Sequence, residues 1–103
     1  TSKSYRSMIA ELTRSLPPGH GCISSRALGE SQRAMLHYFA SIVTHREEIP
    51  ERRRSCELML AQGLRAQPPE IPPGWHQIWE GTRPGEDDEY FWLYGYGPPQ
   101  PLQ

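Results

Sequence analysis

The sequence contains no asparagine and a single lysine, and neither acidic nor basic residues are in clear excess. With a formal net charge of −1, the chain has no overall positive field that would attract nucleic acid. No run of about 18 apolar residues is present, so the sequence predicts no membrane-spanning helix. Walker, GxGxxG, GxSxG and HExxH motifs are also absent, so no familiar reaction is indicated.

Cysteine is scarce as well, with only Cys22 and Cys56 in the chain. Two cysteines do not make a disulfide framework. The N-terminal residues lack the apolar core of a signal peptide and lead directly into an amphipathic pattern. We therefore expect a cytoplasmic protein with reduced thiols.

Arginine, proline and glycine are abundant. Arginine outnumbers lysine ten to one, and proline and glycine together total twenty residues. A GC-rich genome encodes such a set, which fits a high-GC bacterium, a phage or plasmid carried by one, or a GC-rich eukaryotic virus. This bias concerns codons and predicts no activity.

Three segments, 2–16, 31–48 and 50–66, have the spacing of amphipathic helices. Residues 17–30 are expected to form an irregular connection, and Pro50 fits the first turn of the third helix. The apolar positions of the three predicted helices are Tyr5, Met8, Ile9, Leu12 and Leu16, then Met35, Phe39, Ile42 and Val43, then Cys56, Met59, Leu60, Gly63 and Leu64.

The second half of the chain has a different composition. Residues 67–73 contain two proline pairs and predict an extended spacer, and residues 98–103 form a second proline-rich tail. Between them, residues 74–97 hold two aromatic runs around a turn, which predicts a β-hairpin. The expected fold is one α+β domain, with three N-terminal helices (residues 1–66) packed on a C-terminal antiparallel hairpin. This is also the order of elements in a winged-helix domain.

Seven of the ten aromatic residues lie in the predicted hairpin. Because side chains alternate along a strand, Phe91 and Leu93 are expected on one face, and Trp75 and Trp79 are expected to share a face. Helices can cover one face only, and exposed apolar patches usually mark binding surfaces. The alternative is that the proline-rich tail covers the second face. The predicted partner-binding residues are Trp75, Trp79, Tyr90, Trp92, Tyr94 and Tyr96.

These features favour a non-enzymatic interaction or regulatory protein whose partner is another protein or its own copy, as a homodimer. Nucleic-acid binding is the alternative: phosphates would be contacted by Arg52, Arg53, Arg54 and Arg83, with Arg26 and Arg33 as helpers, while the hairpin stacks bases. The acidic tip at residues 86–89 weighs against this alternative because it would repel a phosphate backbone.

Catalytic and metal-binding signals are weak. His20 and Cys22 are the one place where a nucleophile and a base lie close in sequence. A zinc site drawn from these two residues with His37 or His45 and Cys56 lacks the paired spacing of structural zinc ligands. We therefore expect no enzymatic activity, no cofactor and no metal.

Overall fold

The amphipathic stripe at the start of the chain is confirmed as a helix. The computed structural model describes residues 2–83 and 88–99, and in it α1 spans Ser2–Ser15. Burial of Tyr5, Met8, Ile9 and Leu12 against the sheet explains why this stripe is apolar.

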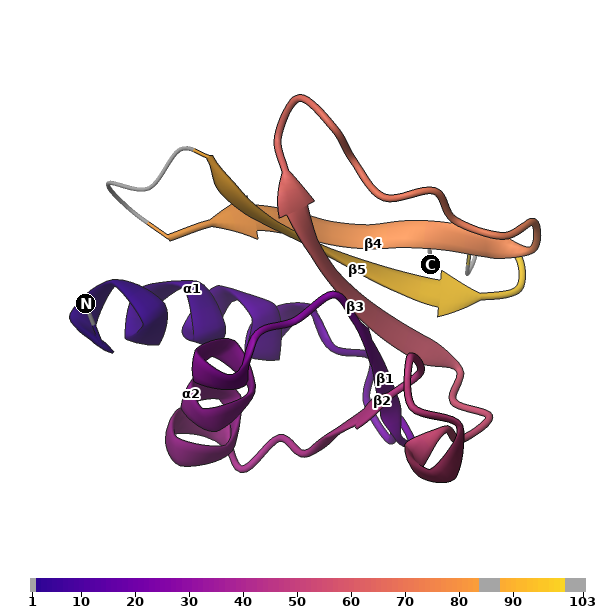
Figure 1. Cartoon of the computed structure of the whole chain (residues 1–103), viewed down its shortest axis with the longest axis horizontal. Helices are drawn as coiled ribbons and strands as arrows, with labels where there is room; N and C mark the ends of the chain where they lie inside the picture. Colours follow the sequence, from indigo (N-terminus) through magenta and orange to yellow (C-terminus); the bar gives the residue numbers. More distant parts are fainter. Residues whose placement is uncertain (1, 84–87, 100–103) are drawn as a thin grey trace.

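The remainder of the described chain is dominated by strands. They form one five-stranded mixed sheet with the order β2-β1-β3-β5-β4 (Figure 1). Strand β1 runs parallel to both β2 and β3, whereas β5 runs antiparallel to both β3 and β4. The elements after α1 are β1 (Ile23–Arg26), α2 (Glu30–Ala40), β2 (Thr44–Arg46), the 3-10 turn η1 (Pro50–Arg52), β3 (Leu58–Leu64), β4 (Trp75–Thr82) and β5 (Glu89–Tyr96).

The predicted fold of three helices on a hairpin is therefore wrong, and with it the winged-helix order of elements. In place of the helix over 50–66, Pro50 begins a single 3-10 turn and Leu58–Leu64 is a strand between β1 and β5. A strand covered on both faces has a continuous apolar run, and such a run can match helical spacing by chance.

The helix predicted over residues 31–48 is also too long, since α2 ends at Ala40. Ser41 adopts a left-handed conformation with φ of 54°, and its N–H donates to the His37 carbonyl at 3.0 Å. The β-branched residues that follow lead into β2, the short edge strand next to β1. The predicted connection 17–30 likewise contains a strand, β1, whose serines gave no apolar signal.

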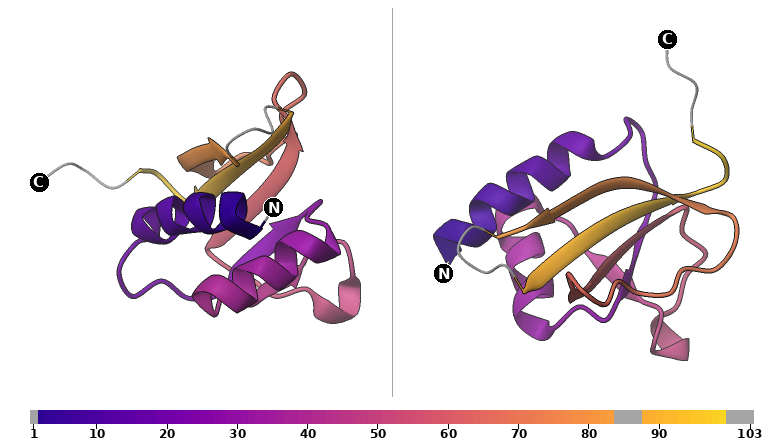
Figure 2. Two further views of the ribbon diagram at one scale, coloured as in Figure 1. Left: turned by 90° about the vertical axis from the view of Figure 1, so that its left-hand side faces the viewer. Right: turned by 90° about the horizontal axis from the view of Figure 1, so that it is seen from above.

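Strand β5 has apolar side chains on both of its faces, as its alternation predicted. Phe91 and Leu93 pack against α1 and α2, which both lie on one side of the sheet (Figure 2). Tyr90, Trp92 and Tyr94 belong to a second cluster on the opposite face, which we call the far face.

The far face is covered by the proline-rich connection between β3 and β4. Ile71 packs against the aromatic cluster there, and the guanidinium of Arg65 lies 5.1 Å from the ring centroid of Tyr90. Arg26 of β1 donates from Nη1 to the carbonyl of Glu70 at 2.5 Å, which fixes this connection to the sheet. The far face is therefore covered by the segment that the sequence predicted as an extended spacer. The predicted tail, residues 98–103, lies mostly outside the described residues, and residues 86 and 87 of the predicted acidic tip also lie outside them.

The prediction that Trp75 and Trp79 share a face is wrong. The pairing of β4 with β5 shifts register between Gln77 and Trp79, so one residue of β4 has no opposite partner. Such a bulge reverses the alternation beyond it. Trp75 therefore packs with the far-face cluster. Trp79 instead packs with the core on the side of the sheet that carries the two helices, which we call the helix-face core.

The prediction of reduced thiols is also wrong, because Cys22 and Cys56 form a disulfide, with Cα atoms 5.1 Å apart. The physical reason is strand pairing. Each cysteine lies just before a strand, and the two strands are parallel neighbours with Ile23 opposite Leu58.

We expect the disulfide to contribute about 4 kcal/mol to the free energy of unfolding, because it closes a loop with a sequence separation of 34 residues. Denaturant unfolding with and without reductant measures this contribution. The double variant Cys22→Ala/Cys56→Ala is the control, and reductant should leave its stability unchanged. Equal stability of the oxidised and reduced wild type would contradict the expectation.

Candidate binding site

Of the six predicted aromatic site residues, Trp79 is half-buried against the helix-face core, and the other five form two groups. Tyr90, Trp92 and Tyr94 are buried, with 9, 5 and 8% of their surfaces exposed, so they offer a partner little area. Tyr96 is 63% exposed, and Trp75 beside it is half-buried. The accessible part of the predicted surface is therefore the end of the hairpin that carries Trp75 and Tyr96.

Trp75 and Tyr96 are directly opposite each other in the β4–β5 pairing. Their ring centroids lie 5.3 Å apart with an interplanar angle of 74°, a favourable edge-to-face arrangement. Gly74 has φ of 100°, and a Cβ there would lie 3.1 Å from the Tyr96 ring, so glycine is required next to the pair. The N–H of Tyr96 donates to the Glu57 carbonyl at 2.8 Å. These contacts hold the two rings in place.

A groove of about 660 Å³ lies next to this pair, and we call it the aromatic groove. The start of β4 and the end of β5 form one wall, β1 contributes two side chains, and the segment before β3 forms another wall. The aromatic groove is lined by Ser24, Arg26, Glu47, Arg53, Arg54, Ser55, Cys56, Glu57, Trp75 and Tyr96.

The charges in the aromatic groove are partly paired. Arg26 Nε lies 2.6 Å from Glu47 Oε1, and this ion pair is only partly exposed. Arg53 donates from Nε to the Glu47 carbonyl at 2.9 Å, which satisfies one of its donors. With Arg54 also at the wall and Glu57 as the other acid, the lining has a small positive excess.

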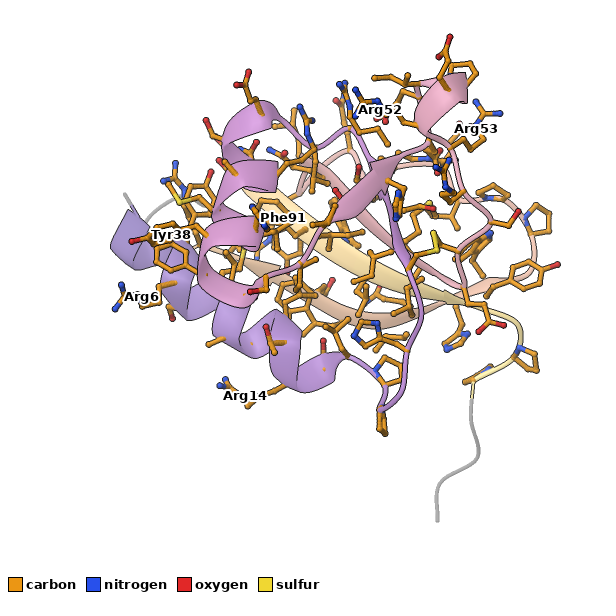
Figure 3. All side chains as sticks on the ribbon, turned by 90° about the horizontal axis from the view of Figure 1, so that it is seen from below. Arg6, Arg14, Tyr38, Arg52, Arg53 and Phe91 are labelled. Atoms are coloured by element: carbon orange, nitrogen blue, oxygen red, sulfur yellow. A yellow bond between two sulfur atoms is a disulfide. The ribbon has the colours of Figure 1, made fainter. Side chains whose placement is uncertain are left out.

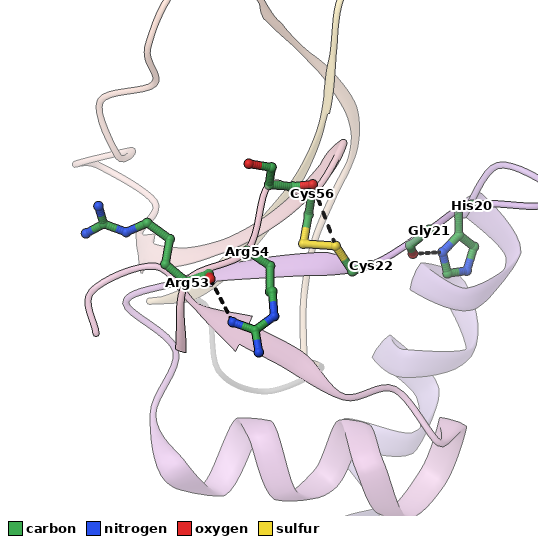
Figure 4. Close-up of a disulfide and its surroundings, with 7 residues drawn as sticks. His20, Gly21, Cys22, Arg53, Arg54 and Cys56 are labelled. Atoms are coloured by element: carbon green, nitrogen blue, oxygen red, sulfur yellow. Dashed lines mark hydrogen bonds between the residues drawn. A yellow bond between two sulfur atoms is a disulfide. The ribbon is translucent and has the colours of Figure 1, made fainter. Parts of the chain in front are cut away.

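The arginines predicted for nucleic-acid binding are only partly brought together, because Arg53 and Arg83 lie apart from the others. The side chains of Arg52 and Arg53 point in different directions (Figure 3), and so do those of Arg53 and Arg54 (Figure 4). Arg52 and Arg54 line a second hollow, which we call the basic pocket, together with Arg33 and Arg46. Of these, Arg46 was missed by sequence reasoning, because the strand that carries it was predicted to be helix.

Arg83 lies at the other end of β4, far along the strand from the Trp75 end. Its guanidinium is 4.7 Å from the Tyr5 ring centroid, and its Nη2 is 3.6 Å from Glu89 Oε1. Tyr5 donates its hydroxyl to Glu89 Oε2 at 2.7 Å and accepts a bond from Gln32. Arg83 thus belongs to a cluster that joins α1 to the hairpin.

The described residues give no support to the weaker chemical signals. Cys22 is disulfide-bonded and has no thiolate to offer, while His20 donates from Nδ1 to the neighbouring Gly21 carbonyl at 2.8 Å. Over residues 2–83 and 88–99, no three histidine, cysteine or carboxylate side chains are grouped as metal ligands. Neither described helix has the length and apolarity needed to cross a bilayer.

Comparison with known proteins gives no relative from which a function can be transferred: no family model, curated protein or solved structure matches the chain.

The Tyr5 hydroxyl gives a prediction about pH. Burial, and then the bond to Glu89, raise the pKa of Tyr5 above its ordinary value. A raised pKa means that the neutral hydroxyl stabilises the fold, a contribution present below about pH 10 and lost as pH rises through the folded-state pKa. Burial also raises the pKa of Tyr94, which adds to the same alkaline loss.

We therefore expect Tyr5→Phe to lower the free energy of unfolding by about 1 kcal/mol near neutral pH. The difference from wild type should shrink as pH rises above about 10 and through the raised pKa, because the wild type then loses the neutral hydroxyl. Urea unfolding at several pH values measures this, with Tyr38→Phe, at an exposed position, as the control. A difference that is constant with pH would contradict the assignment.

Proposed function

We propose that this chain is a small non-enzymatic binding protein whose partner is another protein, held in the aromatic groove. The observation that carries the proposal is the exposed Tyr96 ring, fixed against Trp75 at the wall of a groove of about 660 Å³. Aromatic rings with polar tips are enriched at interface hot spots because they combine a large apolar area with a hydrogen-bonding group.

The lining suggests the kind of segment that would bind. One wall offers the two aromatic rings, and the other carries Arg53 and Arg54. An extended peptide that places an apolar side chain against Tyr96 and an acidic side chain towards the arginines would match both walls. We therefore propose an acidic-apolar segment of another protein as the ligand.

A second copy of the chain is the other protein partner that the sequence suggested. Strand β4 is an edge of the sheet, and two such edges can pair. The bulge between Gln77 and Trp79 interrupts that edge, however, and bulges are one way in which proteins prevent edge pairing. We therefore favour a different protein and expect a monomer in light scattering.

The disulfide also bears on the compartment. The expectation of a cytoplasmic location came from the missing signal-peptide pattern and from the low number of cysteines, and the bond between Cys22 and Cys56 removes the second of these supports. Disulfides form and persist in oxidising compartments. We propose that the protein works in an oxidising environment.

The groove is tested with ligands selected from a displayed peptide library on the folded, oxidised protein. We expect selected peptides to combine acidic and apolar residues, and Tyr96→Ala to weaken their binding about thirtyfold, as expected for a hot spot. The matched control is Tyr38→Ala, because Tyr38 is 80% exposed on α2 and lies outside the groove. Equal effects of the two substitutions in calorimetry would refute the proposal.

Nucleic-acid binding, the second candidate, now relies on Arg52 and Arg54, since Arg83 lies at the other end of β4. If these two residues contact a phosphate backbone, Arg52→Gln/Arg54→Gln should reduce oligonucleotide affinity. The slope of log affinity against log salt concentration should also become shallower, by the amount expected for about two lost phosphate contacts. A gel-shift series at increasing salt measures both quantities. No retention of the wild type at low salt would eliminate this candidate.

A further inference from the structure

The basic pocket has a chemistry that the aromatic groove does not explain. It has a volume of about 450 Å³ and lies where α2, β2 and the η1 region meet. Five of its eight lining residues are basic, and none is acidic. The pocket is lined by Arg33, Val43, Thr44, His45, Arg46, Ile49, Arg52 and Arg54.

Two of the guanidinium groups are held in position by backbone carbonyls. Arg33 donates from Nη1 to the Leu28 carbonyl at 2.6 Å, and Arg54 donates from Nη1 to the Arg53 carbonyl at 2.9 Å. Each bond uses one nitrogen of a group that has five N–H donors, so donors remain for a ligand. The disulfide at Cys56 fixes the segment that carries Arg54 (Figure 4). The pocket is therefore partly preorganised.

Two polar atoms on β2 have unmet hydrogen-bonding capacity. Arg46 Nε and Thr44 Oγ1 are buried, and neither has a hydrogen-bond partner among the described residues. Elsewhere in the described chain, partly buried arginines face carboxylates, as Arg26 faces Glu47. A buried donor of a charged group without a partner is unfavourable, and an anion in this pocket would satisfy it.

We propose that the basic pocket binds the terminal phosphate of a small phosphate monoester. Four arginines demand more than one negative charge in a small volume, and a monoester phosphate has close to two at neutral pH. Its oxygens match the planar fork of arginine. Val43, which is 62% exposed, and Ile49 add an apolar side to the pocket, which suits the organic group of the ester.

The probes are phenyl phosphate, inorganic phosphate and a single-stranded oligonucleotide without terminal phosphates, titrated calorimetrically at low, matched chloride. We expect one site for phenyl phosphate, with inorganic phosphate about tenfold weaker because it lacks the apolar contact. The oligonucleotide, which has only diesters, should bind more weakly than phenyl phosphate. Tighter binding of the oligonucleotide, or equal binding of the two small phosphates, would overturn the proposal of a monoester.

Variants test whether binding occurs in this pocket. Arg52→Gln and Arg46→Gln should each weaken phenyl phosphate binding about tenfold, as expected for a lost charge-assisted bond. Arg52 is exposed, so that variant should fold even if Arg46→Gln does not. Arg53→Gln, in the neighbouring position but at the aromatic groove, and Arg14→Gln on α1 are the matched controls and should stay within about twofold.

Equal losses in all four variants, or no saturable binding by the wild type, would refute the site. The Tyr96→Ala variant should retain full phosphate binding. Its behaviour separates this site from the aromatic groove, so either proposal can fail while the other holds.

Discussion

Burial of β5 on both faces is the constraint on which the rest of this structure depends. Its phenylalanine and leucine face the two helices, while its buried tyrosines and tryptophan face away from them. Exposed together, those far-face rings would form an apolar patch of the kind that promotes association. The proline-rich connection covers them, and Ile71 and Arg65 make the contacts. Because proline pairs stay extended without internal hydrogen bonds, the connection can lie across a sheet while its carbonyls bond to water or to side chains such as that of Arg26.

That cover also decides where a site can be. It leaves Trp75 and Tyr96 accessible at one end of the hairpin, beside the segment that the disulfide ties to β1. The same segment supplies Arg53 and Arg54 to the aromatic groove, and Arg54 also lines the basic pocket. The two candidate sites are therefore neighbours, and reduction of the disulfide would loosen a wall of each.

Sequence reasoning succeeded where one residue pattern has one structural interpretation. The stripe of α1 has a solvated side, so its period was clear, and the alternation of β5 gave the correct faces for its aromatic residues. It failed for β3, where the apolar run is buried on both faces, and for β1 and β2, which are short and polar. The parallel pairing of these strands is a long-range feature that no local period encodes.

The same division applies to the sites. Trp75 and Tyr96 could be predicted because they lie on the aromatic hairpin, whereas the bulge that separates Trp75 from Trp79 could not. Arg52 and Arg54 were recognised as a local cluster. Their association with Arg46 depends on β2 lying next to β1, and the pairing of the cysteines depends on β1 lying next to β3.

The most direct test of the central claim uses the three tryptophan indole N–H signals in an NMR titration with a selected peptide. Because the structure places Trp75 at the aromatic groove, Trp92 under the proline-rich connection and Trp79 in the helix-face core, each signal reports on one region. We expect the Trp75 signal to shift on binding while the Trp92 and Trp79 signals stay in place. A shift of Trp92 with Trp75 unchanged would contradict it, since the partner would then bind beneath the connection.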